Sequence, residues 1–213
     1  MAAERSRKTG SAAKAATPYH HGDLRPALVK AALDILEETG LSALSLRETA
    51  RRVGVSHAAP YHHFSDLDAL ADAVAAEGFR LQKAAMESAR GVVPTSGLDA
   101  LRAYGAVYAD FATRHPALFR LMYTRERVRE DRESELAQAG ADAFRILVDG
   151  ICQASGCPHD RAKSIALLLW SSMHGLALLW LDGQLAWTGE REISPLAAAL
   201  ADTLALVLPA PEA

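Results

Sequence analysis

Eight histidines and two cysteines are the residues of this chain that could bind a metal ion. The histidines of the His20–His21 and His62–His63 pairs are adjacent, whereas a helical metal site needs two histidines four residues apart on one face. No cysteine or carboxylate near these pairs completes a set of four ligands. Cys152 and Cys157 have neither the spacing of a redox motif nor the companions of a disulfide framework, so we expect buried thiols. The sequence therefore predicts no metal site and no cofactor.

Binding chemistry has more support in the sequence than catalysis. The chain has no nucleophile elbow, no glycine-rich phosphate-binding loop and no convincing carboxylate pair, so we expect that it is not an enzyme. Residues 1–64 hold nine Lys and Arg against six Asp and Glu, whereas residues 65–213 hold fourteen against twenty. This basic head on an acidic body predicts a polyanionic partner at the N-terminal end.

The polar side chains of residues 45–64 surround a glycine turn between two short predicted helices. Ser45 followed three residues later by Glu48 is a capping box, which starts the first of these helices. Gly54 can adopt the left-handed backbone that a sharp turn between helices needs. The pattern predicts a helix-turn-helix unit, although short helix–glycine–helix corners also occur where helices only pack together.

The second helix of this unit contains a proline. Ser56 offers an N-cap for it, and His57 is the alternative cap. Pro60 forfeits a hydrogen bond in the first case and lies among unpaired N–H groups in the second. We therefore expect this helix to begin one residue late or as a tighter turn.

Residues 19–70 resemble the DNA-binding domain of the TetR/AcrR family of transcriptional regulators. The motifs that carry the resemblance are Glu37–Gly40, Leu46–Ala50, Gly54–Ser56, Tyr61 and His63–Phe64. The family usually has a lysine three residues beyond this phenylalanine, where it contacts a phosphate, and this chain has Leu67 instead. The resemblance implies DNA binding in which that contact is absent or is supplied by another residue.

The expected DNA contacts fall into two groups. Side chains suited to base edges, through hydrogen bonds or thymine methyl groups, are Arg47, His57, Ala58, Ala59 and His62. Side chains expected to hold phosphates, and so to fix the register without reading sequence, are Ser45, Ser56, Tyr61 and His63.

The N-terminal part of the chain is expected to have two segments. Residues 1–18 are mainly small and polar with four basic residues, which predicts a flexible basic arm that either reaches a minor groove or stays a solvated tail. Residues 19–64 are expected to form a three-helix helix-turn-helix domain. Its first helix should begin near Asp23 and end at Gly40.

The fold class predicted for the whole chain is all-α, with nine to ten helices, because no strand alternation appears. Residues 65–213 are expected to form a ligand-sensing and dimerisation bundle. Its first helix, capped by Ser65 and Asp68, should span about 66–89, and the glycine- and proline-containing segment 91–97 breaks the chain after it. Further helices are expected at 96–113, from Pro116, at 133–154, at 159–182 and after Pro195, and the mixed charges of 125–135 predict a solvated loop and helix start.

The apolar run 165–181 only reaches the short limit for a membrane span. It carries Ser171, Ser172 and His174 near its middle, and no second such run accompanies it. We expect a buried bundle helix rather than a membrane segment. No apolar secretory segment follows the N-terminus, so the expected location is the cytoplasm.

Aromatic and methionine side chains of the predicted body could line a ligand cavity or simply fill the core. Trp170, His174 and Gly175 resemble the tryptophan and histidine–glycine signature of one C-terminal domain class of the same family. Trp170 and His174 share a helix face, which presents an imidazole in an apolar wall unless His174 is an ordinary core histidine. The candidate ligand-binding residues are Tyr104, Tyr108, Phe111, Phe119, Met122, Trp170, Met173 and His174.

The last two predicted helices carry more leucine and alanine than one protomer needs to cover its own body. This excess predicts a homodimer joined through a four-helix bundle. The candidate interface residues are Leu176, Leu179, Trp180, Leu196, Leu200, Leu204 and Val207.

The sequence and the resemblance together predict a homodimeric transcriptional repressor on palindromic double-stranded DNA. The resemblance implies two recognition helices about 34 Å apart, and a small-molecule effector that shifts the helix after the head and so spoils this spacing. We expect the effector to be apolar or aromatic. Two alternatives are a regulator without a small-molecule effector, which would need a filled body, and a helical enzyme.

Overall fold

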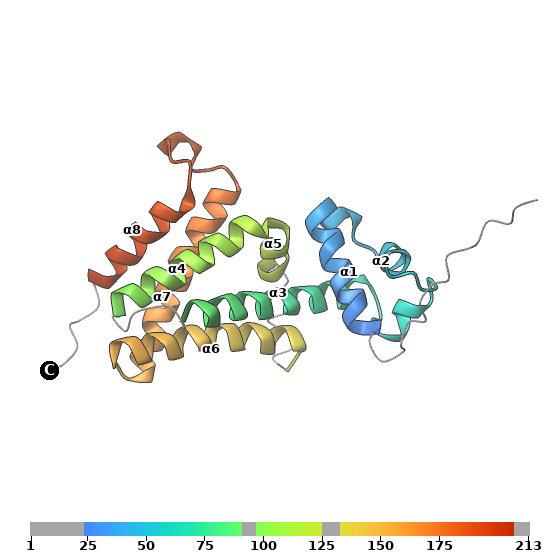
Figure 1. The fold of residues 1–213 in the computed structure, drawn as a ribbon, viewed down its shortest axis with the longest axis horizontal. Coiled ribbons are helices and arrows are strands. Elements are labelled where there is room, and N and C mark those ends of the chain that lie inside the picture. The colour runs from blue at the N-terminus through green and yellow to red at the C-terminus, as the bar shows by residue number, and fades with distance from the viewer. Residues whose placement is uncertain (1–23, 91–96, 125–132, 207–213) are drawn as a thin grey trace, which may run out of the picture.

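The computed structural model describes residues 24–90, 97–124 and 133–206 of the chain. These residues form eight α-helices and three short 3-10 helices and no strand, which confirms the all-α fold class (Figure 1). The count is one α-helix below the nine to ten expected, because the second helix of the helix-turn-helix is a 3-10 helix. The sequence-based expectations for residues 1–23, 91–96, 125–132 and Val207 lie outside the described residues.

The head is a small cluster of helices whose buried apolar side chains are continuous with the core of the body. Its buried side chains include Leu28 and Ile35 of the first helix, Ala50 of the second, and Phe64 after the last. Ala50 has no exposed surface, as expected for a small residue at the contact between helices. The elements of the head are α1 (Leu24–Thr39), η1 (Leu41–Ala43), α2 (Leu46–Val53) and η2 (Ala59–His62).

Local signals in the sequence set both ends of α2. The Glu48 N–H donates to Ser45 Oγ at 3.1 Å, so Ser45 is the predicted N-cap. The Glu48 carboxylate bonds to Arg51 at 2.6 and 2.7 Å, so the side-chain half of the capping box is used elsewhere. Gly54 ends the helix at φ 80°, a conformation that residues with a Cβ rarely adopt.

The element after the turn differs from the expected α-helix. Neither the Ser56 nor the His57 side chain caps it; Ala58 is the N-cap and makes no side-chain hydrogen bond. Pro60 has no N–H to donate, and the 3-10 turns close through Tyr61 N–H to Ala58 O (3.2 Å) and His63 N–H to Pro60 O (2.9 Å). The prediction of a tighter turn is confirmed, and the prediction of a side-chain cap was wrong.

The helix α3 (Leu67–Arg90) runs from the head through the body (Figure 1). Its cap differs from the predicted one: Asp66 Oδ1 accepts from the Ala69 N–H at 2.8 Å, and the Ser65 hydroxyl donates to the same carboxylate. Asp66 is a better N-cap than Ser65, because its carboxylate also interacts favourably with the positive end of the helix dipole. The stretch 73–76 is buried in full, between the head and the body.

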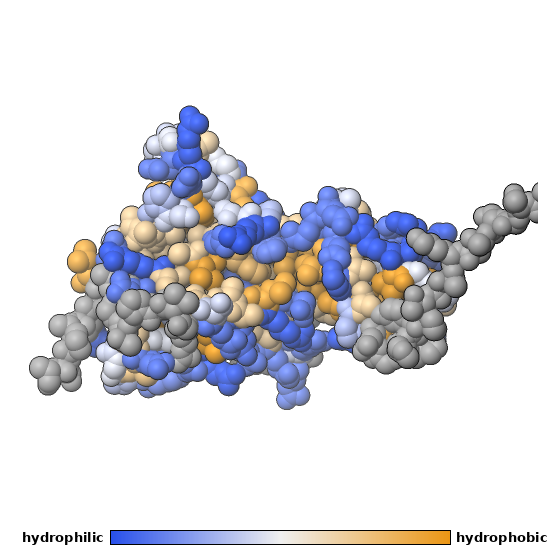
Figure 2. All heavy atoms as spheres, in the orientation of Figure 1, coloured by the Kyte–Doolittle hydropathy of each residue, from blue (hydrophilic) through white to orange (hydrophobic). Residues whose placement is uncertain are grey.

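The body packs its helices around the second half of α3. In Figure 1, α6 runs alongside α3 and α4 lies across them, and α4 also packs on α8. Figure 2 shows apolar residues in a band along the middle of this face, with hydrophilic residues above and below. The elements are α4 (Gly97–Arg114), α5 (Pro116–Thr124), α6 (Glu135–Ser155), α7 (His159–Leu181), η4 (Ala186–Thr188) and α8 (Ile193–Leu206).

Two predictions for the body need correction. The last helix begins at Ile193 rather than after Pro195, because a proline in a first turn loses no intrahelical bond. Cys152 and Cys157 are free and half-buried rather than buried. They lie close to each other at the end of α6, where Cys152 Sγ donates to the Cys157 carbonyl at 3.0 Å.

The helix α7 is mainly apolar from Ile165 onward but packs on one face only. Its buried residues are Ala162, Ile165, Ala166, Leu169, Met173 and Ala177. The helix is long and apolar enough to cross a membrane, but core helices of soluble proteins often are as well. In its most apolar 18-residue stretch, 28 % of the residues are buried in the protein. The expectation of a buried bundle helix is therefore met on one face, and the other face is left uncovered by the described residues.

Candidate nucleic-acid interface and ligand cavity

The nine residues predicted to contact DNA all lie at the surface of the head. Ser45 and Ala59 are half-buried, and the exposed ones are Arg47, Ser56, His57, Ala58, Tyr61, His62 and His63. Tyr61 is 61 % exposed, a large fraction for an aromatic side chain. His63 is exposed rather than packed beside Phe64, so its imidazole is accessible to a partner. All nine side chains are thus at least partly accessible to a partner.

The three arginines of α2 are placed differently. Arg51 pairs with Glu48 at 2.6 Å, and Arg52 pairs with Glu38 of α1 at 2.8 Å. Hydrogen bonds from these arginines hold the pKa of both glutamates below the usual value. Arg47 is exposed and forms no ion pair with any residue in the described part of the chain. Arg47 therefore has a guanidinium available for DNA, whereas Arg51 and Arg52 stabilise the head.

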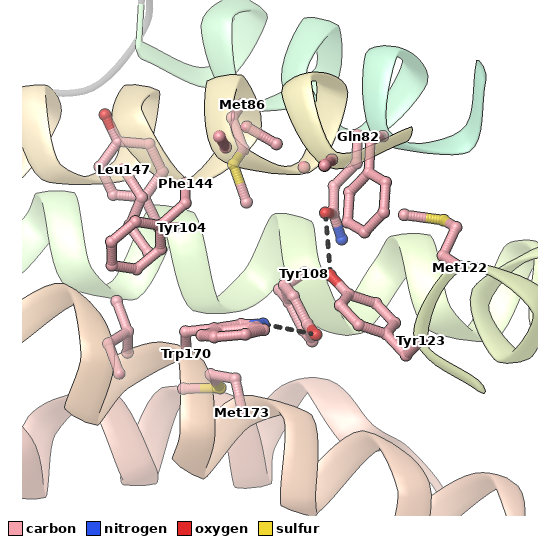
Figure 3. A pocket seen from close by; sticks show the side chains of 16 residues that line it. Gln82, Met86, Tyr104, Tyr108, Met122, Tyr123, Phe144, Leu147, Trp170 and Met173 are labelled. Atoms are coloured by element: carbon pink, nitrogen blue, oxygen red, sulfur yellow. Dashed lines mark hydrogen bonds between the residues drawn. The ribbon is translucent and has the colours of Figure 1, made fainter. Parts of the chain in front are cut away.

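The body contains a cavity of about 330 Å³ between α3, α4, α5, α6 and α7 (Figure 3). Five of the eight predicted ligand-binding residues line it: Tyr104, Tyr108, Met122, Trp170 and Met173. The lining also includes Phe79, Gln82 and Met86 of α3, Tyr123 of α5, and Phe144 and Leu147 of α6. No charged side chain lines the cavity, which suits an uncharged, mainly apolar ligand.

Three predicted ligand-binding residues lie outside the cavity lining. Phe111 is buried and contacts the His115 ring, with centroids 5.1 Å apart. Phe119 is fully buried behind the lining, edge-on to Tyr108 at 5.6 Å. His174 lies behind Tyr108 and bonds to it. Phe111 and Phe119 therefore shape the core. His174 contacts the cavity wall through its bond to the Tyr108 hydroxyl and through the Tyr123 ring, whose centroid lies 4.5 Å from that of the imidazole.

The Tyr108 hydroxyl is the centre of a buried polar network. The Trp170 indole N–H donates to it at 3.2 Å, and it lies 2.8 Å from His174 Nδ1. Burial raises the pKa of Tyr108 well above its usual value and lowers the pKa of His174. A neutral imidazole can accept the hydroxyl proton at Nδ1, so each group here has a partner. His174 is thus an ordinary core histidine, because its Nδ1 already has a hydrogen-bond partner in Tyr108.

Gln82 and Tyr123 form a second polar contact at the cavity wall. The Tyr123 hydroxyl donates to Gln82 Oε1 at 3.2 Å, as Figure 3 shows. Burial raises the pKa of Tyr123, so this hydroxyl keeps its proton. Gln82 was not among the predicted ligand-binding residues. The signal available in the sequence was its place between Phe79 and Met86, on one stripe of an apolar helix.

Three glycines make room for large side chains of the cavity wall. A Cβ on Gly150 would lie 1.8 Å from the Tyr104 hydroxyl oxygen, and a Cβ on Gly105 would lie 2.7 Å from the Met173 methyl carbon. A Cβ on Gly78 would lie 2.6 Å from the Met122 sulfur. Methionine can move away, whereas a tyrosine ring is rigid. Gly150 is therefore the most constrained of the three positions.

A cluster of charges joins the head to the body. Glu135, the first residue of α6, accepts from Arg80 of α3 at 2.6 Å and also pairs with Arg25 of α1. Partial burial acts to raise the pKa of Glu135, but the hydrogen bonds from both arginines outweigh it and lower this pKa. The Arg25 guanidinium also lies over the Phe64 ring, 5.4 Å from its centroid. Arg25 thus connects α6 of the body to the segment that follows η2.

Comparison with known proteins agrees with this arrangement of head and body. The model of bacterial regulatory proteins of the tetR family matches residues 28–74, and that of the tetracyclin repressor-like C-terminal domain matches residues 101–204. An uncharacterized HTH-type transcriptional regulator of Haemophilus influenzae is 30 % identical over 145 residues, 67 % of this chain and 68 % of that protein. This chain belongs to the TetR family of transcriptional regulators. It is a DNA-binding regulator and not an enzyme.

Two further relatives match this TetR-family regulator over different lengths. The class A tetracycline repressor from transposon 1721 of Escherichia coli is 46 % identical over 54 residues, which are 24 % of this chain and 25 % of that protein. A solved structure of a protein of unknown function from Rhodococcus sp. RHA1 is 36 % identical with a TM-score of 0.73, and the match covers 89 % of this chain and 97 % of that one.

Substitution of Gly150 by alanine should disturb the cavity of this regulator. The new methyl group would collide with the rigid Tyr104 ring, so we expect the free energy of unfolding to fall by about 1–3 kcal/mol. Gly140→Ala is the matched control on α6, because its Cβ would meet Phe79 at an ordinary 3.6 Å. Urea unfolding at one protein concentration measures both. Equal stability of the two variants would contradict the close approach of Tyr104 to Gly150.

Proposed function

We propose that this TetR-family regulator is a homodimeric repressor that binds a palindromic operator and is released by a small apolar or aromatic effector. The protein acts in the cytoplasm, where bacterial DNA lies. Its head would hold the DNA, and the cavity of about 330 Å³ would hold the effector. A regulator without an effector would need a filled body, and the cavity argues against that alternative.

The observation that carries this proposal is that the helix that lines the cavity begins directly after the residues proposed to contact DNA. α3 starts directly after the exposed side chains of the head, and its residues Phe79, Gln82 and Met86 line the cavity. A ligand that displaces this part of α3 therefore changes the orientation of the head. For release, the ligand must prefer the conformation that does not fit DNA, by a coupling free energy of typically about 1–3 kcal/mol.

The proposed contacts with DNA follow from exposure and chemistry. Arg47, His57 and His62 offer hydrogen-bond donors to base edges, and the small side chains of Ala58 and Ala59 fit against thymine methyl groups. The hydroxyl groups of Ser45, Ser56 and Tyr61, and the His63 imidazole, are proposed to hold phosphates. Leu67 is exposed at the start of α3 and offers no charge there, so phosphate binding rests on these four side chains.

The proposed dimer uses the uncovered faces of α7 and α8. Leu168 and Leu179 are 55 % and 47 % exposed and fall on one stripe of α7 with Gly175. A Cβ on Gly175 would meet nothing within 4 Å in its own protomer, so a partner helix could approach closely there. Leu206 of α8 is also exposed. Of the interface residues predicted from sequence, Leu179 is exposed, whereas Leu176, Trp180, Leu196, Leu200 and Leu204 are half-buried.

Binding of DNA is tested by selection from genomic fragments with the purified protein. A palindromic consensus should emerge, and affinity for it should fall about a thousandfold or more between 50 and 200 mM salt if six to ten phosphates are contacted. His57→Ala should change the preferred base at one position of each half-site. Tyr61→Phe should weaken all sites about equally. A set of fragments without a consensus, or a flat response to salt, would refute the proposed role of the head.

Charge on the α7 stripe should break the dimer. Leu168→Glu and Leu179→Glu each place two carboxylates in a two-fold interface, so we expect the dimer dissociation constant to rise about a hundredfold or more. Leu41→Glu, at a similarly exposed leucine of η1 in the head, is the control. Analytical ultracentrifugation over a concentration series measures this constant. Dimers as tight as wild type in both α7 variants would exclude this interface.

The ion pairs of Glu135 with Arg25 and Arg80 are proposed to couple DNA binding at the head to the conformation of the cavity wall. Binding of the selected operator should slow amide hydrogen exchange in residues 137–141, which follow Glu135 on α6 and include part of the cavity wall. Glu135→Gln should abolish this slowing, because it removes the carboxylate that Arg25 and Arg80 share. Asp142→Asn is the control, since Asp142 pairs only with Arg145 of its own helix among the described residues. The same slowing in all three proteins would show that coupling takes another route.

A further inference from the structure

The side-chain amide of Gln82 is the most unusual group in the cavity wall. Gln82 is 2 % exposed, and its Nε2 is the only buried side-chain nitrogen or oxygen in the described part of the chain that has no hydrogen-bond partner. Buried polar groups are normally paired, because an unpaired donor loses its hydration and gains nothing in return. An unpaired donor in a cavity wall therefore indicates a partner that arrives with a ligand.

The orientation of this amide is fixed by its other end. The Tyr123 hydroxyl donates to Gln82 Oε1 at 3.2 Å, so the oxygen is occupied. In Figure 3 the Gln82 side chain extends from α3 toward Tyr123, with its nitrogen beside that contact and within the ring of lining residues. The free N–H groups of Nε2 are thus held toward the interior of the cavity.

The other polar groups of the lining are already engaged. The Trp170 indole N–H donates to the Tyr108 hydroxyl, which is also bonded to His174, and the Tyr123 hydroxyl donates to Gln82. The phenol of Tyr104 lies against Gly150 and has a partner of its own. The cavity therefore offers a ligand one uncommitted donor group, the NH2 of the Gln82 amide, in an otherwise apolar wall.

The absence of charge in the lining restricts the ligand further. No arginine, lysine, histidine, aspartate or glutamate is among the residues that line the cavity. A carboxylate or an ammonium group would lose its hydration there without a counter-charge, which costs much more than the desolvation of a neutral carbonyl. A charged ligand is therefore disfavoured, and a pure hydrocarbon would leave Nε2 unpaired.

We propose that the ligand of this cavity is a neutral, mainly apolar molecule that carries one hydrogen-bond acceptor, a ketone or a related carbonyl group, and that Gln82 Nε2 donates to this oxygen. This inference rests on the proposed function in that the cavity is taken as the effector site. It adds the chemical class of the effector and the residue that recognises its polar group. Tyr123 acts as the positioning residue, because its hydroxyl holds the amide in this orientation.

The test uses three matched sets of probes on the full-length protein. The ketones are acetophenone, benzophenone and 2-decanone; their hydrocarbon analogues are ethylbenzene, diphenylmethane and decane; and the anions are benzoate, 4-benzoylbenzoate and decanoate. Binding is measured by calorimetry, or by the change in tryptophan fluorescence, to which Trp170 at the cavity wall contributes. In at least one set the ketone should bind about tenfold tighter than its hydrocarbon, as one added hydrogen bond allows, and the anion should bind more weakly than both.

The variant that tests the assignment is Gln82→Met, which keeps the volume of the side chain but has no N–H donor. It should abolish the preference for ketone over hydrocarbon and leave affinity for the hydrocarbon within a few-fold of wild type. Gln184→Leu, at an exposed glutamine after α7, is the control and should keep the preference. Unchanged operator binding and an unchanged circular dichroism spectrum show that Gln82→Met is folded. Tyr123→Phe removes the hydroxyl that holds the Gln82 amide, so it should reduce the preference for ketone over hydrocarbon only partially.

The outcomes separate this inference from the proposed function. Equal affinity for ketone and hydrocarbon in wild type, a preference that survives in Gln82→Met, tighter binding of the anions, or no binding of any probe would overturn the role of Gln82. Sequence-specific operator binding would still support the repressor in each of these cases. Conversely, a ketone that binds through Gln82 without weakening operator affinity would support the ligand class and count against release by this ligand.

Discussion

The structure depends on the packing of one continuous helix, α3, which contacts the head with its first part and the body with its second part, inside one contiguous apolar core. Its stretch 73–76 is buried in full, with Leu70 in the core beside the head and Phe79 at the cavity. A helix is stiff along its length because each residue is tied to the next turn by a backbone hydrogen bond. The two ends of α3 therefore cannot change their environment independently. This constraint relates a cavity in the body to side chains of the head that share no contact with it.

The second constraint is the cost of polar groups inside an apolar body. Tyr108, Trp170 and His174 satisfy one another, and burial keeps the tyrosine protonated and disfavours the charged form of the histidine. Such a network fixes side-chain orientations that apolar packing alone would leave loosely defined. Gln82 differs from these groups, because only one end of its amide is paired. Selectivity for a ligand is proposed to come from this difference rather than from the shape of the apolar wall.

Several apolar side chains are exposed at the surface of the protomer. Tyr61 in the head and the leucines of α7 and α8 are exposed although water is a poor solvent for them, and each group lies where a partner is proposed. The charged residues that join head and body, Arg25 and Glu135, are paired instead. Charged residues between head and body are thus paired within the protomer, whereas the leucines of α7 and α8 and the polar side chains of the head are left open to partners.

The sequence by itself determined the features that depend on neighbouring residues. Helical periodicity, the Ser45 cap and the left-handed Gly54 are local, so the all-α class, most helix bounds and the exposed side chains of the head could be predicted. The family resemblance predicted a role for these side chains in DNA binding. The 3-10 form of η2 was only partly predictable, because Pro60 removes a donor but packing decides what replaces it. Tertiary structure alone decided which aromatic residues face the cavity: Phe119 and Tyr108 have similar sequence signals, and only the packing of α4, α5 and α7 buries the first and exposes the second to the cavity. Tertiary structure also decided that Leu200 and Leu204 pack on the protomer's own core, and that Gln82 lines a cavity with its Nε2 unpaired. The sequence could not show either feature, because both depend on contacts between helices that are distant in sequence.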